Sequence, residues 1–250
     1  MADTQHVAVV TGGASGIGLG IVRHLLAEGM AVVAVDWSDN ACVEARKLLA
    51  PAGDRIRVVK ADVGTLEGAK LGIDTAVEAF GHLDLLCNNA ALHPLETIEE
   101  HSLETWRETL RVNVDGTMLC SQAAIRQMKR QKKGTIVNMG SISGSMAYAG
   151  GGAYATSKAA IAQLTKVLAL EAGPYGITVN CIEPGTIRHR PGTENESASH
   201  IPIGRAGTVT DVAKLVSYLA SDAASYMTGS VITLDGGATA GRVRVSKKKS

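Results

Sequence analysis

Short apolar runs alternate with amphipathic segments along almost the whole of this 250-residue chain. Seven runs rich in β-branched residues predict buried strands at 7–10, 31–35, 56–59, 83–87, 135–138, 178–182 and 230–234. Helical periodicity between them predicts helices at 17–28, 40–49, 66–80, 103–130, 154–172 and 210–220. Such alternation is typical of an α/β protein in which helices cover both faces of a parallel sheet. The unequal connections favour an open, doubly wound sheet of seven strands, although eight-stranded barrels alternate in a similar way.

No repeat, linker or change of composition divides the chain, so we expect a single domain over residues 1–240. Residues 241–250 contain Lys247, Lys248 and Lys249 and are predicted to form a flexible basic tail. A hook for nucleic acid or for a membrane is the alternative interpretation of this tail.

The composition excludes several classes of function. The 25 basic and 24 acidic side chains leave a formal charge of +1, so no overall field attracts nucleic acid or an anionic membrane. The four cysteines are scattered without a CxxC pair, and no histidine lies at metal-ligand spacing, so we expect reduced thiols and no metal site. No apolar run approaches the ~20 residues that span a bilayer, and no signal segment precedes Val7. We therefore expect a soluble, cytoplasmic protein.

A glycine-rich turn directly follows the first predicted strand. Its sequence, Thr11-Gly12-Gly13-Ala14-Ser15-Gly16-Ile17-Gly18, leads at once into a helical pattern. Glycines at such a turn let backbone N–H groups approach a pyrophosphate, which then lies at the positive end of the helix. In preference to a turn without a ligand, we predict a Rossmann-type dinucleotide cradle with contacts from Gly12, Ser15, Gly16, Ile17 and Gly18.

Two acidic residues at the ends of later strands predict which dinucleotide binds. Asp36 ends the second strand, where a carboxylate can accept hydrogen bonds from a ribose diol and would repel a 2′-phosphate. Trp37 adds bulk at the same place, so the sequence predicts NAD rather than NADP. Asp62, after the third strand, could accept a hydrogen bond from the adenine amino group. A carboxylate that caps the strand end is the alternative for Asp36.

Tyr154 and Lys158 stand one helical turn apart, and Ser141 precedes them by thirteen residues. Tyrosine titrates near ~10, and an ammonium at ~4 Å in an effective dielectric of ~20 favours the phenolate by on the order of 4 kcal/mol. We therefore expect a lowered pKa at Tyr154 and proton transfer in both directions near neutral pH. An amphipathic helix with a solvated Lys158 is the alternative for the pair in isolation.

This ordered set of motifs resembles the short-chain dehydrogenase/reductase family in its single-domain form. Members of that form are about as long as this chain, which has 250 residues. The resemblance covers nearly the whole sequence. Residues 11–18 resemble the TGxxxGxG loop, Asn88-Asn89-Ala90 resembles the NNAG motif, and Tyr154 to Lys158 resembles YxxxK. Further family-like positions are held by Asn113, Pro184-Gly185 and the Leu-Asp-Gly-Gly segment at 234–237.

The resemblance implies a role for each matching residue. Tyr154 would exchange a proton with the substrate oxygen, Lys158 would lower its pKa and hold the nicotinamide ribose, and Ser141 would orient the same oxygen. Asn113 would position a water that links Lys158 to solvent. Cofactor contacts are implied for Asp36, Trp37, Asp62, Val63, Asn89, Ala90, Tyr154, Lys158, Gly185 and Ile187.

Two positions depart from the family pattern. Ala91 replaces the glycine that usually follows Asn-Asn-Ala, which adds a methyl group near the cofactor ribose. His189 stands where the family often has a threonine that meets the nicotinamide carboxamide, so Gly185 and Ile187 are the safer contacts there.

The segment at 186–202 is predicted to cover the substrate. It is polar and has few bulky apolar groups, so we expect a small polar alcohol or ketone such as a sugar, polyol or hydroxy acid. Arg188 and Arg190 could pair with an anionic substrate, with a solvated loop face as the alternative. His93, just past the Asn-Asn-Ala-Ala turn, is expected to be a loop histidine at the pocket mouth.

The sequence thus predicts an NAD-dependent oxidoreductase that transfers a hydride between the cofactor and a secondary alcohol or ketone. A 3-oxoacyl-[acyl-carrier-protein] reductase and a non-catalytic NAD-binding sensor or scaffold are the alternatives. Apolar residues of the helices at 103–130 and 154–172, such as Ile161, Leu164 and Leu168, exceed what one sheet face needs. Together with the resemblance, they predict a homotetramer.

Overall fold

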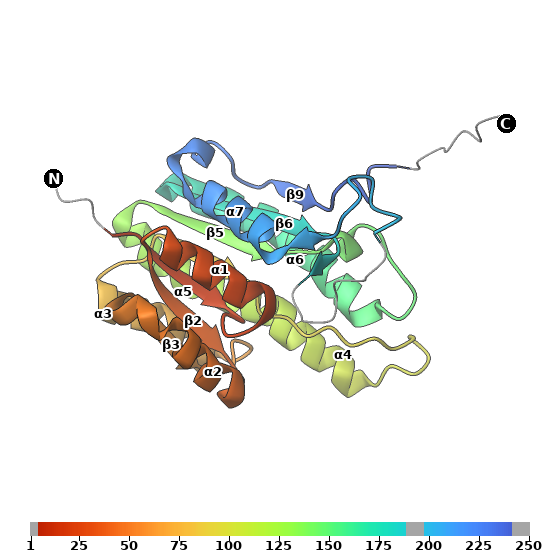
Figure 1. The fold of residues 1–250 in the computed structure, drawn as a ribbon, viewed down its shortest axis with the longest axis horizontal. Helices are drawn as coiled ribbons and strands as arrows, with labels where there is room; N and C mark the ends of the chain where they lie inside the picture. Colours follow the sequence, from red (N-terminus) through yellow and green to blue (C-terminus); the bar gives the residue numbers. More distant parts are fainter. Residues whose placement is uncertain (1–4, 189–197, 242–250) are drawn as a thin grey trace.

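The computed structural model describes residues 5–188 and 198–241. Its centre is a seven-stranded parallel sheet with the order β3-β2-β1-β4-β5-β6-β9 (Figure 1). The strands are β1 (Val7–Thr11), β2 (Ala31–Asp36), β3 (Ile56–Lys60), β4 (Leu85–Asn88), β5 (Gly134–Met139), β6 (Ile177–Pro184) and β9 (Val231–Leu234). The predicted fold class, a doubly wound α/β sheet in one domain, is confirmed.

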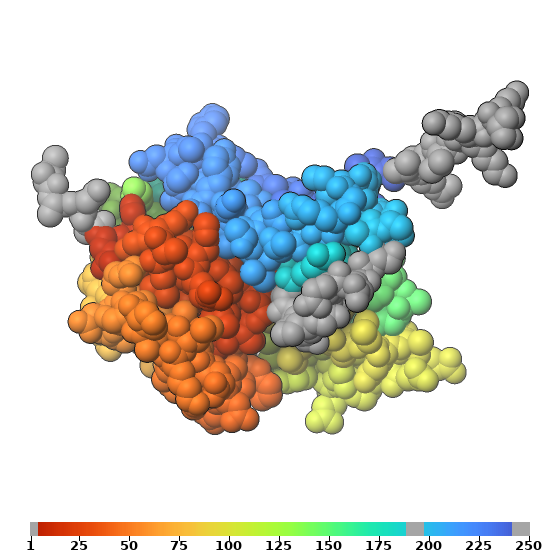
Figure 2. Space-filling model, viewed as in Figure 1, coloured from red at the N-terminus to blue at the C-terminus, as the bar shows by residue number. Residues whose placement is uncertain are grey.

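Helices cover both faces of this sheet (Figure 1). One face is covered by α1 (Gly16–Ala27), α2 (Asp39–Leu49) and α7 (Val209–Ala220), and the other by α3 (Leu66–Phe80), α5 (Gly116–Gln131) and α6 (Gly152–Ala172). Figure 2 shows that α1, in red, and α7, in blue, pack side by side although they come from opposite ends of the chain. Short 3₁₀ turns lie at Ala50–Arg55, Ile142–Gly144, Gly173–Tyr175 and Asp222–Ala224.

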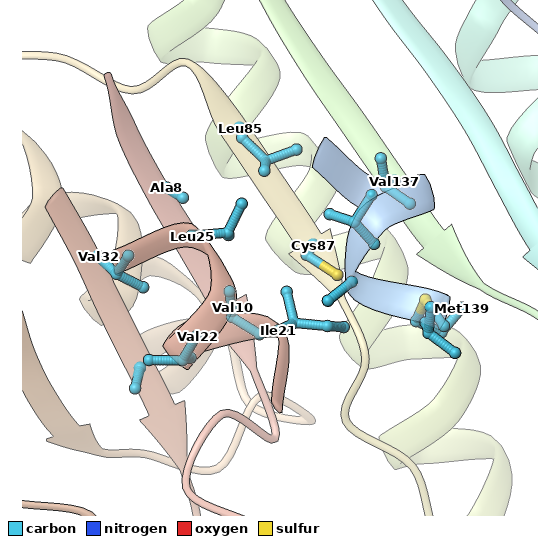
Figure 3. Close-up of a cluster of buried hydrophobic side chains, with 14 of the residues drawn as sticks. Ala8, Val10, Ile21, Val22, Leu25, Val32, Leu85, Cys87, Val137 and Met139 are labelled. Carbon is cyan, nitrogen blue, oxygen red and sulfur yellow. The ribbon is translucent and has the colours of Figure 1, made fainter. Parts of the chain in front are cut away.

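Residues of β1 alternate between two hydrophobic cores. Ala8 and Val10 pack against Leu25 of α1 and its neighbours (Figure 3), whereas Val7 and Val9 belong to the core on the opposite face. All five residues of β1 are buried. A central parallel strand buried on both faces has to be a continuous apolar run, which is the pattern that predicted it.

The strand order changes direction between β1 and β4. The chain builds β1 to β3 on one side of the sheet, returns to β4, and then builds β5, β6 and β9 on the other side. In open α/β sheets, ligands bind beyond the carboxyl ends of the strands at such a switch point. The glycine turn after Thr11 and the Asn-Asn-Ala segment that begins at Asn88 meet there, because β1 and β4 end at these residues.

The helix predicted over 103–130 is divided into three parts. It consists of α4 (Leu103–Leu110), a π-helical turn at Arg111–Asp115, and α5. π-Helical turns are rare and are frequent at functional sites. Hydrophobic periodicity did not predict this turn, because one inserted residue leaves the apolar spacing on either side intact. A second feature that was not predicted is a short parallel pair of β7 (Ile187–Arg188) and β8 (Gly207–Thr208).

The apolar residues expected to form an oligomer interface lie elsewhere. Ile161 and Leu168 are buried, and Leu168 packs in the core beneath α6, with Leu164 against it. The prediction was wrong for these residues because the sheet face needs more apolar area than the sequence suggested. The exposed apolar residues of α6 are instead Val167 and Leu170.

Residues 5–188 and 198–241 contain no helix that is long and apolar enough to cross a membrane. The same residues contain no group of three His, Cys, Asp or Glu side chains that could hold a metal ion. All four cysteines are free thiols in buried positions. The predicted basic tail, apart from Gly241, lies outside the described residues.

Candidate active site

A cavity of about 1010 Å³ opens beyond the carboxyl ends of the central strands. Most of the predicted site residues line it, namely Gly12, Ser15, Gly16, Ile17, Asp36, Trp37, Asp62, Val63, Asn89, Ala90, Ser141, Tyr154, Lys158, Gly185 and Ile187. Gly18 and Asn113 were also predicted but do not line the cavity; both support its wall. His189 lies outside the described residues.

The turn after β1 has no room for a Cβ atom at Gly12 or Gly18. Gly12 and Gly16 have φ values of +61° and +52°, in the left-handed region that favours glycine. A Cβ atom on Gly12 would lie 2.9 Å from Asn89 Nδ2, and one on Gly18 would overlap the carbonyl oxygen of Gly12. The bare backbone at the start of α1 therefore fits a pyrophosphate, whose oxygens would accept hydrogen bonds from the N–H groups there.

Asn89 holds this turn in place. Its Nδ2 donates to Thr11 O at 3.0 Å and to Gly12 O at 3.2 Å. In return, Thr11 Oγ1 accepts hydrogen bonds from the backbone N–H groups of Asn89 at 3.0 Å and Ala90 at 3.1 Å. These four bonds fasten the end of β1 to the end of β4, so the Asn89 amide supports the cradle in addition to lining the cavity.

Asp36 ends β2 beside the glycine turn and is buried. Its Oδ2 accepts a hydrogen bond from Ala14 N at 3.2 Å, and its Oδ1 accepts one from Ser38 N at 3.1 Å. Two lone pairs of the carboxylate are left for other donors, such as the hydroxyls of a ribose. Trp37 follows it with 70% of its surface exposed and also borders the cavity.

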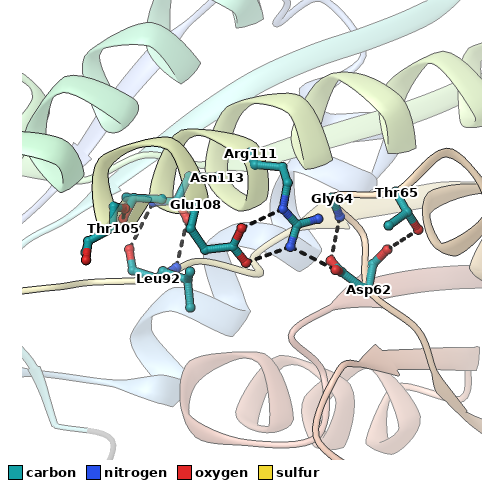
Figure 4. Close-up of polar contacts among 9 residues, drawn as sticks. Asp62, Gly64, Thr65, Leu92, Thr105, Glu108, Arg111 and Asn113 are labelled. Carbon is teal, nitrogen blue, oxygen red and sulfur yellow. Dashed lines mark hydrogen bonds and ion pairs between the residues drawn. The ribbon is translucent and has the colours of Figure 1, made fainter. Parts of the chain in front are cut away.

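Asp62 is engaged by a residue that the sequence analysis missed. Arg111 Nη2 donates to Asp62 Oδ2 at 2.8 Å and to Glu108 Oε1 at 2.7 Å, while Gly64 N donates to Asp62 Oδ1 at 2.9 Å (Figure 4). Burial raises the pKa of Asp62, but the hydrogen bonds from Arg111 and Gly64 outweigh it and the pKa lies below its usual value. Since Arg111 begins the π-helical turn, this ion pair ties the cavity wall to that turn.

Lys158 carries a buried ammonium beside Tyr154. The residue is 2% exposed, and its Nζ donates to Met139 O at 2.7 Å. Nζ lies 5.5 Å from the centre of the Tyr154 ring. Burial lowers the pKa of Lys158 to about 8, because the charged form loses its hydration.

Tyr154 does not have the lowered pKa that the sequence predicted. Burial raises the pKa of its phenol above the usual value, and a hydrogen bond with Ser141 offsets this only in part. The prediction was wrong for the chain alone, because it counted the charge of Lys158 and omitted the desolvation of both groups. A further positive charge near the ring would favour the phenolate.

Asn113 lies in the π-helical turn, where its amide is fully engaged (Figure 4). Its Oδ1 accepts from Leu92 N at 2.7 Å, and its Nδ2 donates to Leu92 O at 3.0 Å and to Ser157 Oγ at 2.9 Å. Ser157 Oγ donates in turn to the backbone oxygen of Tyr154 at 2.7 Å. The side chain thus fastens the turn to α6.

The His93 side chain stacks on Tyr154, and Tyr148 contacts His93 from a second loop. The rings of His93 and Tyr154 are stacked, with centroids 4.0 Å apart and an interplanar angle of 26°. His93 Nε2 lies 2.6 Å from the hydroxyl of Tyr148. His93 was predicted only as a loop histidine at the pocket mouth, and Tyr148 was not predicted, since contacts between loops leave no periodic signal.

The remaining predicted residues lie where β6 ends. Gly185 N donates to Leu234 O at 3.0 Å, which joins this turn to β9. Ile187 and Arg188 form β7, and Ile187 lines the cavity. The rest of the polar segment that suggested a small polar substrate, including Arg190, falls mainly at 189–197, outside the described residues.

Comparison with known proteins agrees with this arrangement. The family model described as Enoyl-(Acyl carrier protein) reductase matches residues 12–239. The chain is 40% identical to a 3-alpha-(or 20-beta)-hydroxysteroid dehydrogenase of Mycobacterium tuberculosis, over 94% of this chain and 90% of the relative. It is 37% identical to a cis-4-hydroxycyclohexanecarboxylate dehydrogenase of Sinomonas cyclohexanicum, over 96% and 98% of the two chains.

A solved structure is also similar. A short-chain type dehydrogenase/reductase from Mycobacterium ulcerans superposes with a TM-score of 0.90 at 32% identity, covering 97% of this chain and 92% of that one. The residues that the family model matches include the glycine turn from Gly12 onward, α6 and β9. The chain therefore belongs to the short-chain dehydrogenase/reductase family and is an oxidoreductase of the kind that uses a nicotinamide cofactor.

Proposed function

We propose that this protein is an NAD-preferring dehydrogenase that interconverts a secondary alcohol and its ketone. The observation that carries the proposal is the position of Tyr154, Lys158 and Ser141 in one cavity with the bare glycine turn. A dinucleotide held at that turn extends along the carboxyl edge of the sheet, the edge where these three side chains lie.

The roles of the side chains follow from their chemistry. NAD, when bound, supplies the hydride acceptor. Tyr154 takes the proton of the substrate hydroxyl during oxidation and returns it during reduction. Ser141 hydrogen-bonds the same oxygen. Lys158 Nζ donates one of its three N–H groups to Met139 O, which leaves two for the ribose hydroxyls. The positive charge of Lys158 favours the phenolate of Tyr154.

Asp36 supports the choice of NAD. Its carboxylate is fixed by two backbone N–H groups at the adenosine end of the cavity. A 2′-phosphate placed near this carboxylate would meet a like charge, whereas a ribose diol would meet an acceptor. The same feature speaks against a 3-oxoacyl reductase that prefers NADPH.

The substrate class we propose is a secondary alcohol on a saturated carbon ring. The relatives named above include a 3-alpha-(or 20-beta)-hydroxysteroid dehydrogenase and a cis-4-hydroxycyclohexanecarboxylate dehydrogenase. The 3-hydroxyl of a steroid and the 4-hydroxyl of the cyclohexane are both secondary alcohols on a saturated ring. Leu95, Ile98 and Met146 are exposed on the two loops that hold His93 and Tyr148, so these loops present apolar side chains to a substrate. The small polar alcohol predicted from the segment at 186–202 is the second candidate, favoured by Arg188.

Location and assembly are part of the proposal. A cytoplasmic homotetramer is proposed from the resemblance, and the exposed Val167 and Leu170 of α6 are the apolar residues that could bury one another between subunits. A non-catalytic sensor is disfavoured, because the partly buried phenol of Tyr154, placed with Ser141 in the same cavity, is not needed to bind the cofactor alone.

Replacement of the proposed acid/base is expected to remove turnover but not cofactor binding. We expect Tyr154→Phe to lower kcat by about 10³-fold, because general acid/base catalysis contributes roughly 10²–10⁴-fold. The dissociation constant for NAD, measured by calorimetry, should change less than about threefold. Tyr226→Phe makes the same chemical change at a fully exposed site and is the control. Retention of wild-type turnover by Tyr154→Phe would remove this residue from the mechanism.

Removal of the charge of Asp36 is expected to relax the choice of cofactor. We expect Asp36→Asn to raise the ratio of kcat/KM for NADP to kcat/KM for NAD by about tenfold, since one like-charge repulsion of ~1.4 kcal/mol disappears. Asp39→Asn changes an exposed carboxylate in the same turn and should leave the ratio unchanged. An unchanged ratio in the folded Asp36→Asn variant would contradict the assignment.

A screen of alcohols tests the substrate class. Hydroxysteroids, 4-hydroxycyclohexanecarboxylates, sugars, polyols and short hydroxy acids would be oxidised with NAD, with NADH formation as the measurement. We expect kcat/KM for the best ring alcohol to exceed that for the best open-chain polyol by at least about tenfold. A preference for polyols would restore the small polar substrate and overturn the ring-alcohol proposal.

A further inference from the structure

His93 follows the end of β4, on a loop that is held against the loop before α6. Glu96 N donates to Gly150 O at 2.9 Å, and Glu96 pairs with Gly151 in an isolated parallel bridge. A Cβ atom on Gly151 would overlap the ring of Tyr148, so the absence of a side chain there makes room for this tyrosine. The backbone thus brings His93 and Tyr148 together in front of α6.

The His93 ring covers one face of the Tyr154 phenol. The centroid distance of 4.0 Å and the angle of 26° define a stacked pair in direct contact. Tyr154 lies in the first turn of α6, and its side chain is partly buried. A stacked ring restricts rotation of the phenol about its side-chain torsions, and a reacting oxygen has to be held within a small distance of its partner for efficient proton transfer.

Tyr148 fixes the orientation of His93. An exposed histidine on a loop normally samples several rotamers, but the 2.6 Å contact between Nε2 and the Tyr148 hydroxyl holds this one in a single arrangement. Tyr148 also hydrogen-bonds Ser143, whose hydroxyl accepts a hydrogen bond from Ser141 Oγ at 3.1 Å. These contacts form a chain of side chains around the proposed reacting atoms, from Tyr154 through His93, Tyr148 and Ser143 to Ser141.

We propose that His93 is a positioning residue for Tyr154, and that Tyr148 acts through it by fixing the imidazole. The proposal rests on the acid/base role given above to Tyr154. His93 touches the phenol ring and also lines the cavity, so its removal affects the reacting geometry at one end of a long site. The phosphate cradle and Asp36 lie on other elements and are unaffected.

Three variants separate the stacking contact from the hydrogen bond. His93→Ala removes both, and we expect kcat to fall about tenfold with NAD affinity changed less than about twofold. His93→Phe keeps a ring but loses the nitrogen, and should restore kcat to within about threefold of the wild type. Tyr148→Phe keeps its ring but loses the hydroxyl, and should lower kcat about threefold.

A double variant gives the sharpest test. If Tyr148 acts through the His93 nitrogen, Tyr148→Phe should have no further effect on kcat in the His93→Phe background, because the hydrogen bond is already gone. His6→Ala, at the amino end of β1 on the opposite edge of the sheet, and Tyr226→Phe are the matched controls and should leave kcat unchanged. Thermal unfolding and NAD titration of every variant distinguish a folded protein from a damaged one.

Several outcomes would overturn the proposal. An unchanged kcat in folded His93→Ala would exclude a positioning role, and a full loss of kcat in His93→Phe would exclude stacking as the cause. An equal effect of Tyr148→Phe in both backgrounds would show that Tyr148 acts independently of His93. If Tyr154→Phe retains turnover, the proposed function itself fails, whereas an inactive Tyr154→Phe with an unaffected His93→Ala removes only this inference.

Discussion

The site depends on an ammonium that is held away from water. Lys158 is almost completely buried, and its Nζ donates to the backbone oxygen of Met139 at the end of β5. The cost of this burial appears as a pKa lowered from 10.5 to about 8. Burial of the Lys158 ammonium therefore lowers the free energy of unfolding at pH values below about 8, and this destabilisation disappears as the pH rises toward 10.5. A charge kept under such conditions is best explained by a use in chemistry.

The fold brings the partners of this charge together by ending its strands at one edge. The glycine turn follows β1, and the loop after β4 carries Asn89 and His93. Met139 ends β5 and Ser141 lies in the loop that follows it, while Gly185 lies in the turn after β6. The π-helical turn then joins both ends of the cavity. Arg111, at its start, binds Asp62 after β3, and Asn113, two residues later, is tied through Ser157 to the helix of Tyr154.

The sequence predicted what regular patterns encode. The seven strands follow from apolar runs buried on both faces, and the cradle follows from glycines placed between a strand and a helix. The π-helical turn was missed because it leaves the apolar spacing on either side intact. The ion pair of Arg111 with Asp62 and the stack of His93 on Tyr154 were missed because each depends on contacts between segments distant in the chain. The pKa of Tyr154 was predicted in the wrong direction for the same reason, since desolvation depends on packing around the phenol.

The most direct test of this account is the titration of Tyr154 itself. In protein labelled at the tyrosine ζ-carbon, its NMR signal is identified by its absence from Tyr154→Phe and followed between about pH 7 and pH 9.5. Without NAD, the phenol should stay neutral throughout this range. With saturating NAD, whose oxidised ring is a cation, it should ionise within the range in the wild type but not in Lys158→Met. The account would be contradicted if the Tyr154 signal titrated identically with and without NAD. It would also be contradicted if NAD caused the same ionisation of Tyr154 in Lys158→Met as in the wild type.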